Sequence, residues 1–258
     1  MRVNGVVSRI LATNAGGNDV VALCENARPF RRRLHAMTSL LSAIEIETAP
    51  NPTATVIWLH GLGDNGHGWS QVVPALRMGA APAVRFIFPH APQIAVAINN
   101  GHVMPAWYDI REANLNERAD LAGVRRSQQQ VEALIAREKT RGVPAARIVL
   151  AGFSQGGAIA LYTGLRHAER LAGIVALSTY LVDAPALVAE AAPINRDLPV
   201  FMGHGTHDPV VRLAWAEASR RALEAGGWKV EWHTYAMEHS ALPEEIADIA
   251  VFLRKVFA

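Results

Sequence analysis

The feature that most constrains the fold is a set of short, almost continuous apolar segments along the chain. Residues 55–59, 84–88 and 147–151 are of this kind, and residues 172–177 and 199–202 follow the same pattern. A strand that is buried on both faces of a parallel sheet needs apolar side chains on both sides, so it lacks the alternation of a half-exposed strand. These segments therefore predict the central strands of a mostly parallel sheet.

The residues between these segments show the spacing of helices. Segment 120–141 places apolar side chains such as Leu121, Val124 and Val131 at the intervals of an amphipathic helix. Strands that alternate with helices predict an α/β fold in which helices cover both faces of the sheet. We expect further helices over residues 155–165, 213–225 and 243–257, outer strands over 40–48 and 228–235, and a loop over 94–103.

Composition excludes several classes of protein. Half of the 258 residues are apolar, which is enough for one large core, and the net charge is only +2. Nucleic-acid binding needs a strong basic field, so no nucleic-acid partner is expected. The chain has no stretch of about 18 uninterrupted apolar residues, so no membrane span is expected. The single cysteine, Cys24, excludes an internal disulfide.

One serine lies in the sequence context that nucleophilic catalysis needs. Gly152-Phe153-Ser154-Gln155-Gly156 follows the predicted strand 147–151 and opens the predicted helix 155–165. A tight strand-to-helix turn of this kind is the nucleophile elbow of α/β-hydrolases, which holds the serine in a strained conformation above the sheet. The following helix directs its positive end toward the serine. We therefore predict Ser154 to be a nucleophile on an α/β-hydrolase fold.

A serine hydroxyl needs a base that takes its proton and an acid that orients the base. In α/β-hydrolases both follow the serine, and the acid comes first. Asp208 follows the predicted strand 199–202, at the sheet edge where such folds place their sites, and His239 follows the last predicted strand. We predict Asp208 as the acid and His239 as the base, with Asp183 as the rival acid. The other histidines are expected to have structural or surface roles.

Two backbone N–H groups must stabilise the oxygen that becomes negative during acyl transfer. One is predicted to belong to Gln155, the residue after the nucleophile. The other is predicted to belong to Leu62, because His60-Gly61-Leu62-Gly63-Asp64 follows an early strand and its glycines permit a backbone bend. No metal or other cofactor is expected, since His204 and His207 form the only close ligand pair and no dinucleotide or P-loop fingerprint is present.

At these residues the chain resembles the phospholipase/carboxylesterase family, which includes bacterial carboxylesterases and acyl-protein thioesterases. The resemblance covers about residues 40–258 and rests on Leu59-His60-Gly61-Leu62-Gly63-Asp64-Asn65-Gly66, Pro89-His90-Ala91-Pro92, Met104-Pro105-Ala106-Trp107-Tyr108-Asp109-Ile110, Gly152-Phe153-Ser154-Gln155-Gly156-Gly157, His204-Gly205 with Asp208-Pro209-Val210, and Met237-Glu238-His239. It implies a compact α/β-hydrolase without a large cap domain, the triad Ser154–Asp208–His239, and Leu62 and Gln155 as oxyanion donors. Ala106 departs from the pattern, because the family often has serine there.

The start of the chain has no counterpart in that pattern. Residues 1–36 hold six arginines against two acidic residues and show no regular apolar period. We expect residues 1–36 to be a poorly ordered N-terminal extension and residues 37–258 to form the α/β-hydrolase catalytic domain. Met37 is then the natural start, which mass spectrometry of the N-terminus would test. No apolar stretch of a secretory signal follows the basic start, so a cytoplasmic location is expected.

The sequence says less about the substrate. Loops beside the predicted triad carry apolar side chains that are candidates for an acyl-binding site, although packing beneath the loops accounts for them equally well: Leu62, Met104, Trp107, Leu181, Val210 and Val211. The first hypothesis is a serine carboxylesterase that hydrolyses short to medium acyl esters through an acyl-enzyme. The alternative is an acyl-protein thioesterase or lysophospholipase that acts on longer lipid acyl groups.

A third hypothesis is a hydrolase-fold binding module, a kind of protein that usually lacks a catalytic residue. The serine, the acid, the histidine and the glycine-containing loop are all present, so catalysis is favoured. The expected partner is a small-molecule ester or acyl-thioester substrate. Some members of the family form dimers, so a homodimer is also an expectation, but no sequence feature identifies its interface.

Overall fold

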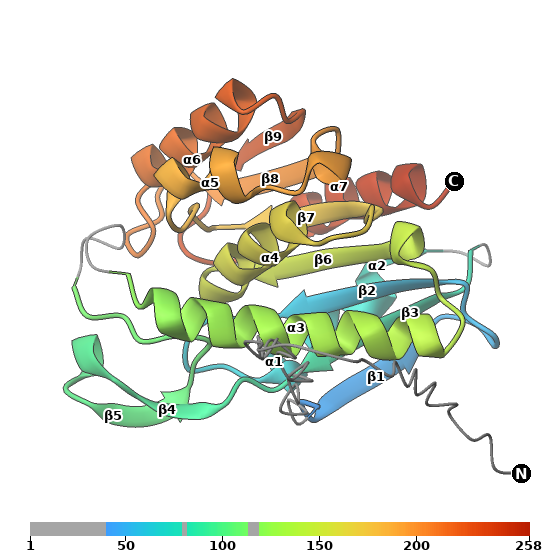
Figure 1. The fold of residues 1–258 in the computed structure, drawn as a ribbon, viewed down its shortest axis with the longest axis horizontal. Helices are drawn as coiled ribbons and strands as arrows, with labels where there is room; N and C mark the ends of the chain where they lie inside the picture. The colour runs from blue at the N-terminus through green and yellow to red at the C-terminus, as the bar shows by residue number, and fades with distance from the viewer. Residues whose placement is uncertain (1–39, 79–81, 113–118) are drawn as a thin grey trace, which may run out of the picture. The chain divides into compact units, whose positions relative to one another are not determined.

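The computed structural model describes residues 40–78, 82–112 and 119–258, apart from the side chain of residue 188. The predictions for residues 1–36 therefore lie outside the described residues. In the described part of the chain, one seven-stranded sheet has the order β1-β3-β2-β6-β7-β8-β9 (Figure 1). Only its edge strand β1 is antiparallel to its neighbour. The strands are β1 (Ala43–Glu47), β2 (Ala54–Leu59), β3 (Val84–Pro89), β6 (Ile148–Phe153), β7 (Gly173–Leu177), β8 (Val200–Gly205) and β9 (Val230–Tyr235).

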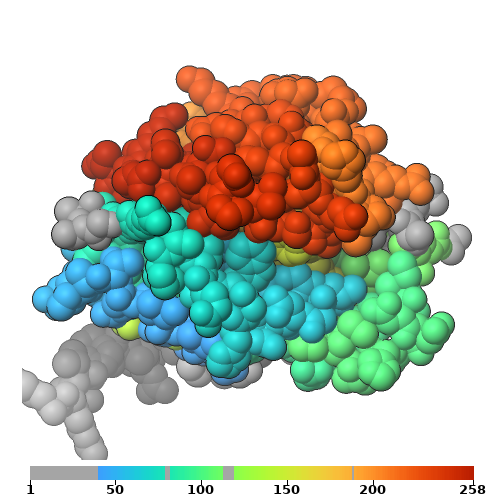
Figure 2. Space-filling view, turned by 180° about the vertical axis from the view of Figure 1, so that it is seen from behind, coloured from blue at the N-terminus to red at the C-terminus, as the bar shows by residue number. Residues whose placement is uncertain are grey.

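Helices cover both faces of this sheet, which confirms the predicted architecture. One face carries α3 (Leu121–Thr140), α4 (Gln155–Arg166), α5 (Ala184–Glu190) and α6 (Leu213–Ala225). The other face carries α1 (Gly66–Ser70), α2 (Val72–Leu76) and α7 (Pro243–Val256). Figure 2 views this second face and shows α7, in red, next to the cyan segment that holds α1 and α2. Short 3₁₀ turns cover Ala97–Asn99, Ala145–Arg147 and Pro193–Asn195.

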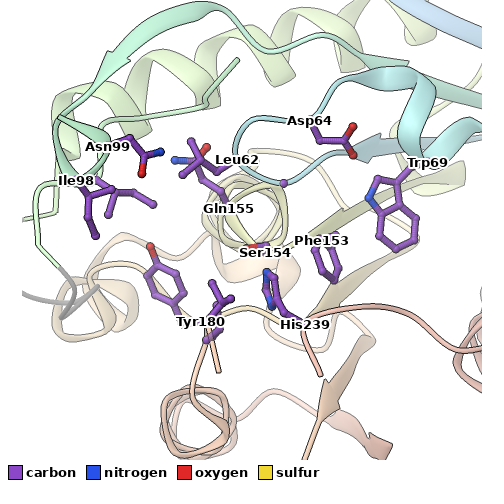
Figure 3. Close-up of a pocket in the computed structure, with 14 residues that line it drawn as sticks. Leu62, Asp64, Trp69, Ile98, Asn99, Phe153, Ser154, Gln155, Tyr180 and His239 are labelled. Carbon is purple, nitrogen blue, oxygen red and sulfur yellow. The ribbon is translucent and has the colours of Figure 1, made fainter. Parts of the chain in front are cut away.

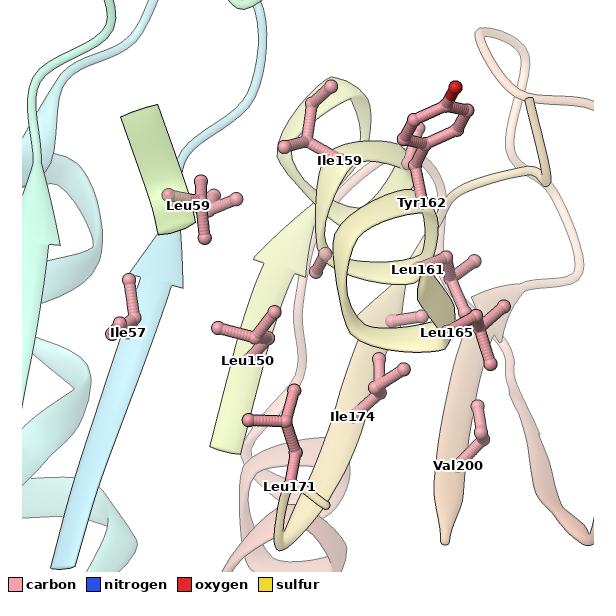
Figure 4. Close-up of a cluster of buried hydrophobic side chains, with 14 of the residues drawn as sticks. Ile57, Leu59, Leu150, Ile159, Leu161, Tyr162, Leu165, Leu171, Ile174 and Val200 are labelled. Carbon is pink, nitrogen blue, oxygen red and sulfur yellow. The ribbon is translucent and has the colours of Figure 1, made fainter. Parts of the chain in front are cut away.

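The central strands are apolar throughout because each face of the sheet meets its own layer of helices. All six residues of β2 are buried. Ile57 and Leu59 pack in the cluster under α3 and α4, whereas Val56 and Trp58 pack in the cluster under α2 and α7. Figure 4 shows the first cluster, with side chains of the strands packed against α4. Successive side chains of one strand thus pack in two different hydrophobic clusters, one on each face of the sheet.

The prediction of a loop over 94–103 is wrong. β4 (Gln93–Val96) and β5 (His102–Pro105) form a separate antiparallel hairpin. Asn100 and Gly101 at its turn have positive φ angles of 56° and 74°. Such backbone angles favour asparagine and glycine, so the Asn-Gly pair was the available signal for a hairpin. The strands are short and only Val96 among their residues is buried, so they lack the apolar pattern that identified the central strands.

Glu245 is a buried carboxyl group in α7 with no hydrogen-bond partner among the described residues. It packs against Gly203 of β8, where an added Cβ would lie 2.2 Å from Glu245 Oε1. Burial, and then the nearby Asp248, raise the pKa of Glu245 from 4.5 to about 8. The folded protein therefore keeps a proton that the unfolded chain loses as the pH rises above 4.5.

Because the folded state binds this extra proton, stability should fall as the pH rises from 4.5 to about 8. The slope from this group is at most about 1.4 kcal/mol per pH unit. We expect Glu245→Gln, which cannot ionise, to flatten the dependence of the melting temperature on pH across this interval. Glu244→Gln, an exposed change in the same helical turn, should leave it as in the parent. Equal slopes in the parent protein and Glu245→Gln would contradict this account.

Candidate active site

Ser154 occupies the turn between β6 and α4 with a strained backbone. Its φ is 53° and its ψ is −121°, a conformation that a residue with a side chain rarely adopts. Hydrogen bonds on both sides hold it there. The Ser154 N–H donates to the Leu177 carbonyl at 2.8 Å, and the Ser154 carbonyl accepts the Thr179 hydroxyl at 2.6 Å. The neighbouring strand β7 thus fixes the serine at the end of the sheet.

The glycines on either side of Ser154 leave space for this turn. A Cβ on Gly152 would lie 2.4 Å from the carbonyl carbon of Gly156. A Cβ on Gly156 would lie 2.3 Å from the carbonyl oxygen of Leu59. Both contacts are to backbone atoms, which cannot rotate away as a side chain does. The close backbone approach expected from the motif is therefore present at both glycines.

Asp208 and His239 form a hydrogen-bonded pair beside Ser154. His239 Nδ1 lies 2.7 Å from Asp208 Oδ2, and Asp208 Oδ1 accepts the N–H groups of Val210 and Val211 at 2.8 and 2.9 Å. Burial alone would raise the pKa of Asp208, but the hydrogen bonds from His239 and these amides lower it. An ionised Asp208 keeps the proton of a neutral His239 on Nδ1, so Nε2 is free to accept a proton. Figure 3 shows His239 next to Ser154.

The contact with His239 favours Asp208 over Asp183 as the acid. Asp183 is partly exposed at the start of α5, and the carboxylate that contacts His239 is that of Asp208.

A second histidine packs against the loop that carries Asp208. His204, at the end of β8, donates from Nε2 to the Val211 carbonyl at 2.8 Å. Its Nε2 also lies 3.6 Å from Asp208 Oδ2, and burial lowers the pKa of His204. A neutral His204 therefore supports the loop that carries Asp208.

Buried hydrogen bonds connect the start of α4 with the loop that holds Leu62. The Gln155 side chain accepts the Trp107 N–H at 2.9 Å, and the Trp107 indole N–H donates to the His60 carbonyl at 2.8 Å. His60 Nε2 accepts the N–H of Ala91 at 3.0 Å, so Nδ1 carries the proton and donates to the Gly61 carbonyl at 2.7 Å. Burial lowers the pKa of His60, which keeps the ring in this neutral form.

The two N–H groups predicted as oxyanion donors lie on either side of this network. Leu62 and Gln155 both line the pocket at Ser154. Gln155 is the first residue of α4, and the first N–H groups of a helix have no acceptor within it. The Leu62 N–H donates to no other residue in the part of the chain that the structure describes. Both groups are thus free to donate to a substrate oxygen.

A pocket of about 430 Å³ opens at Ser154 and His239, a volume usual for small-molecule sites. Figure 3 shows Ile98, Asn99 and Tyr180 on one side of Ser154, and Trp69, Phe153 and Asp64 on the other. Apolar side chains predominate among the residues that line it, which are Gly61, Leu62, Asp64, Trp69, Ile98, Asn99, Ile110, Phe153, Ser154, Gln155, Tyr180, Val210, Val211 and His239. The site can therefore hold an apolar group next to the serine.

Half of the predicted acyl-site residues lie in this pocket. Leu62, Val210 and Val211 line it. The structure does not bring Met104, Trp107 and Leu181 to it. Trp107 and Leu181 are buried in the core, where the Leu181 N–H donates to Ser219 Oγ at 2.8 Å, and Met104 Sδ accepts the Asn99 side-chain amide at 3.3 Å.

Sequence reasoning missed five large side chains of the pocket, namely Trp69, Ile98, Ile110, Phe153 and Tyr180. Phe153 lies inside the elbow motif, so its place next to Ser154 could have been predicted. Ile98 lies between β4 and β5, in the hairpin that the sequence pattern did not predict. Trp69 in α1 and Tyr180 after β7 had no sequence signal beyond their size, because only the fold brings these segments to Ser154.

Within the described residues, no group of three or more His, Cys, Asp or Glu side chains is arranged to hold a metal ion. None of the helices in residues 40–78, 82–112 and 119–258 is long and apolar enough to cross a bilayer.

The fold, the nucleophile elbow and the Asp–His pair define a serine hydrolase of the α/β-hydrolase class. Residues 42–257 match the family model described as Phospholipase/Carboxylesterase, and the chain belongs to this family. It is 41% identical over 224 residues to acyl-protein thioesterase 1 of Gibberella zeae, and this alignment covers 83% of this chain and 95% of the relative. It is 43% identical over 218 residues to acyl-protein thioesterase 1 of Yarrowia lipolytica, covering 83% and 96%.

Solved structures agree with this assignment. The crystal structure of Zea mays acyl-protein thioesterase 2 superposes with a TM-score of 0.72 at 30% identity, covering 84% of this chain and 100% of that one. The predicted family, the α/β-hydrolase fold without a large cap domain, and the enzyme class are confirmed. The chain is a serine hydrolase of the type that cleaves carboxylic esters or thioesters.

Proposed function

We propose that this enzyme hydrolyses acyl thioesters with longer acyl chains, using Ser154, His239 and Asp208 as its triad. The observation that carries the proposal is the mainly apolar pocket that holds both Ser154 and His239. The names of the relatives support acyl-protein thioesters as the substrate class. The sequence alone had favoured short to medium esters, and the relatives favour its alternative.

In the proposed reaction, Ser154 Oγ attacks the carbonyl carbon while His239 Nε2 takes the hydroxyl proton. The Leu62 and Gln155 N–H groups donate to the oxygen as it becomes negative. When the intermediate collapses, the carbon–sulfur bond breaks, His239 gives its proton to the departing thiolate, and the acyl group stays on Ser154 as an ester. Asp208 stabilises the charged imidazole throughout.

Water completes the cycle. It attacks the acyl-enzyme while His239 Nε2 takes its proton, and the same two N–H groups stabilise the second intermediate. Collapse returns the proton to Ser154 Oγ and releases the carboxylic acid. No step needs a group other than the enzyme, the substrate and water.

A series of saturated acyl thioesters and oxygen esters with fixed leaving groups tests this proposal. Each methylene buried in the pocket should contribute about 0.8 kcal/mol, so we expect kcat/KM to rise about fourfold per added methylene until the pocket is filled. Thioesters should exceed esters of the same chain length. A maximum at the shortest chains, followed by a decline, would contradict the proposal and favour a short-chain carboxylesterase.

The homodimer and the cytoplasmic location predicted from the sequence stay predictions, since no feature of the described residues bears on either of them.

A further inference from the structure

A pair of buried tyrosine hydroxyls lies at the wall of the pocket. Tyr180 follows β7 and lines the pocket, and Tyr108 follows β5 and packs behind it. Their hydroxyl oxygens are 2.6 Å apart, and each residue is only 2% exposed. The Tyr108 carbonyl accepts the Gln155 side-chain amide at 2.7 Å, so this wall is tied to the start of α4.

The surroundings of the pair determine which hydroxyl donates. Two hydroxyls have two protons, but only one proton can lie between the two oxygens. Among the described residues, the Tyr108 hydroxyl has no partner other than Tyr180, and Tyr108 does not line the pocket. If Tyr180 donated to Tyr108, the Tyr108 proton would be buried without an acceptor, which is costly. Tyr108 is therefore the donor, and the proton of Tyr180 is directed elsewhere.

The remaining direction for the Tyr180 proton is the pocket. No other side chain of the described residues accepts it. Burial raises the pKa of Tyr180 to about 12, so the hydroxyl keeps its proton at neutral pH. Figure 3 shows the Tyr180 side chain on the same side of Ser154 as Ile98. This wall thus offers a hydrogen-bond donor beside apolar side chains.

The acyl chain is the part of a substrate that meets this wall. A leaving group such as a protein cysteine must extend into solvent. An acyl chain is apolar, so its burial in the pocket is favourable. Tyr180 is almost completely buried, so its side of the pocket suits the acyl chain. A plain hydrocarbon chain would leave the Tyr180 donor without a partner, and an oxygen on the chain would satisfy it.

We propose that Tyr180 is a specificity-determining residue that recognises acyl chains carrying a hydrogen-bond-accepting oxygen, such as a hydroxyl, oxo or ether group. This inference rests on the proposed function of the same site. It adds to that function a preference among acyl groups of equal length, which an apolar pocket alone does not provide.

The test uses a saturated acyl thioester and its hydroxy-substituted analogues, with the hydroxyl moved along the chain and the leaving thiol kept constant. The readout is the ratio of kcat/KM for each hydroxyacyl substrate to that for the plain substrate. Because both values come from one enzyme sample, the ratio does not depend on the fraction that is folded. Tyr180→Phe and Tyr108→Phe both break the hydroxyl pair, but only Tyr180→Phe removes the hydroxyl of the residue that lines the pocket.

We expect the ratio in the parent enzyme to reach a maximum at one hydroxyl position. Tyr180→Phe should lower the ratio at that position on the order of tenfold, because it removes a donor that the hydroxyacyl chain pairs and the plain chain leaves unpaired. Tyr108→Phe should change the ratio less than about twofold, since the Tyr180 donor remains.

Three results would overturn the inference. Equal changes of the ratio in both variants would mean that the pair only supports the fold. A ratio that does not vary with hydroxyl position in the parent enzyme would mean that water satisfies Tyr180. Absence of hydrolysis of every substrate by the folded parent enzyme would overturn the proposed function along with the inference, so the two failures are distinguishable.

Discussion

Replacement of Ser154 by alanine should lower kcat for thioester and ester hydrolysis on the order of 10⁴-fold or more. The substitution removes the oxygen that forms the acyl-enzyme, whereas the apolar pocket and the free N–H groups of Leu62 and Gln155 remain. KM should therefore change much less than kcat. Steady-state kinetics of the purified variant, together with its melting temperature, would measure both effects.

Ser178→Ala is the matched control for this experiment. Ser178 is also a serine with a positive φ, 44°, at the end of the adjacent strand, but it does not line the pocket. Its replacement likewise removes a serine hydroxyl from a residue with a positive φ, and we expect kcat to stay close to that of the parent enzyme. Turnover near the parent value in Ser154→Ala would show that another group is the nucleophile.

The second large effect is expected from Asp208→Asn, which keeps the shape of the side chain and removes its charge. The Val210 and Val211 N–H groups that bind Oδ1 would hold the amide oxygen, so the amide nitrogen would face His239. That nitrogen donates, and His239 Nδ1 would have to accept. The ring proton would then move to Nε2, where it prevents His239 from taking the Ser154 proton. We expect kcat to fall about 10⁴-fold.

Asp183→Asn provides the comparison for this change, because it replaces the rival acid, which lies after the neighbouring strand β7. Its kcat should match that of the parent enzyme. The double variant Ser154→Ala/Asp208→Asn should be no slower than Ser154→Ala alone, because the three residues act as a unit. Additive losses, or a larger loss in Asp183→Asn than in Asp208→Asn, would contradict the assignment of the acid.

The parts of the fold that sequence predicted well are those with a strong local cause. β2 and β6 are apolar because both of their faces are buried. The glycines beside Ser154 are needed because a Cβ on either of them would clash with backbone atoms. Such requirements leave a pattern in a few neighbouring residues. The pairing of Asp208 with His239 could also be expected, because the family pattern fixes the order of the serine, the acid and the histidine along the chain.

The features that sequence missed depend on contacts between distant segments. Tyr180 and Tyr108 meet only because the loops after β7 and β5 converge at the pocket. Trp107 was expected to line the acyl site, but its indole N–H is used to hold the His60 carbonyl, which draws the ring into the core. A large apolar side chain in a loop has the same appearance in sequence whether it lines a pocket or packs beneath it.

The central claim is that Ser154 becomes acylated, and covalent labelling tests it most directly. The parent enzyme would be treated with a fluorophosphonate, and the modified residue would be located by peptide mass spectrometry, with Ser154→Ala and Ser178→Ala treated in parallel. We predict a single adduct on Ser154 in the parent enzyme and in Ser178→Ala, and none in Ser154→Ala. An adduct on a different residue, or no adduct on the folded parent enzyme, would contradict the account.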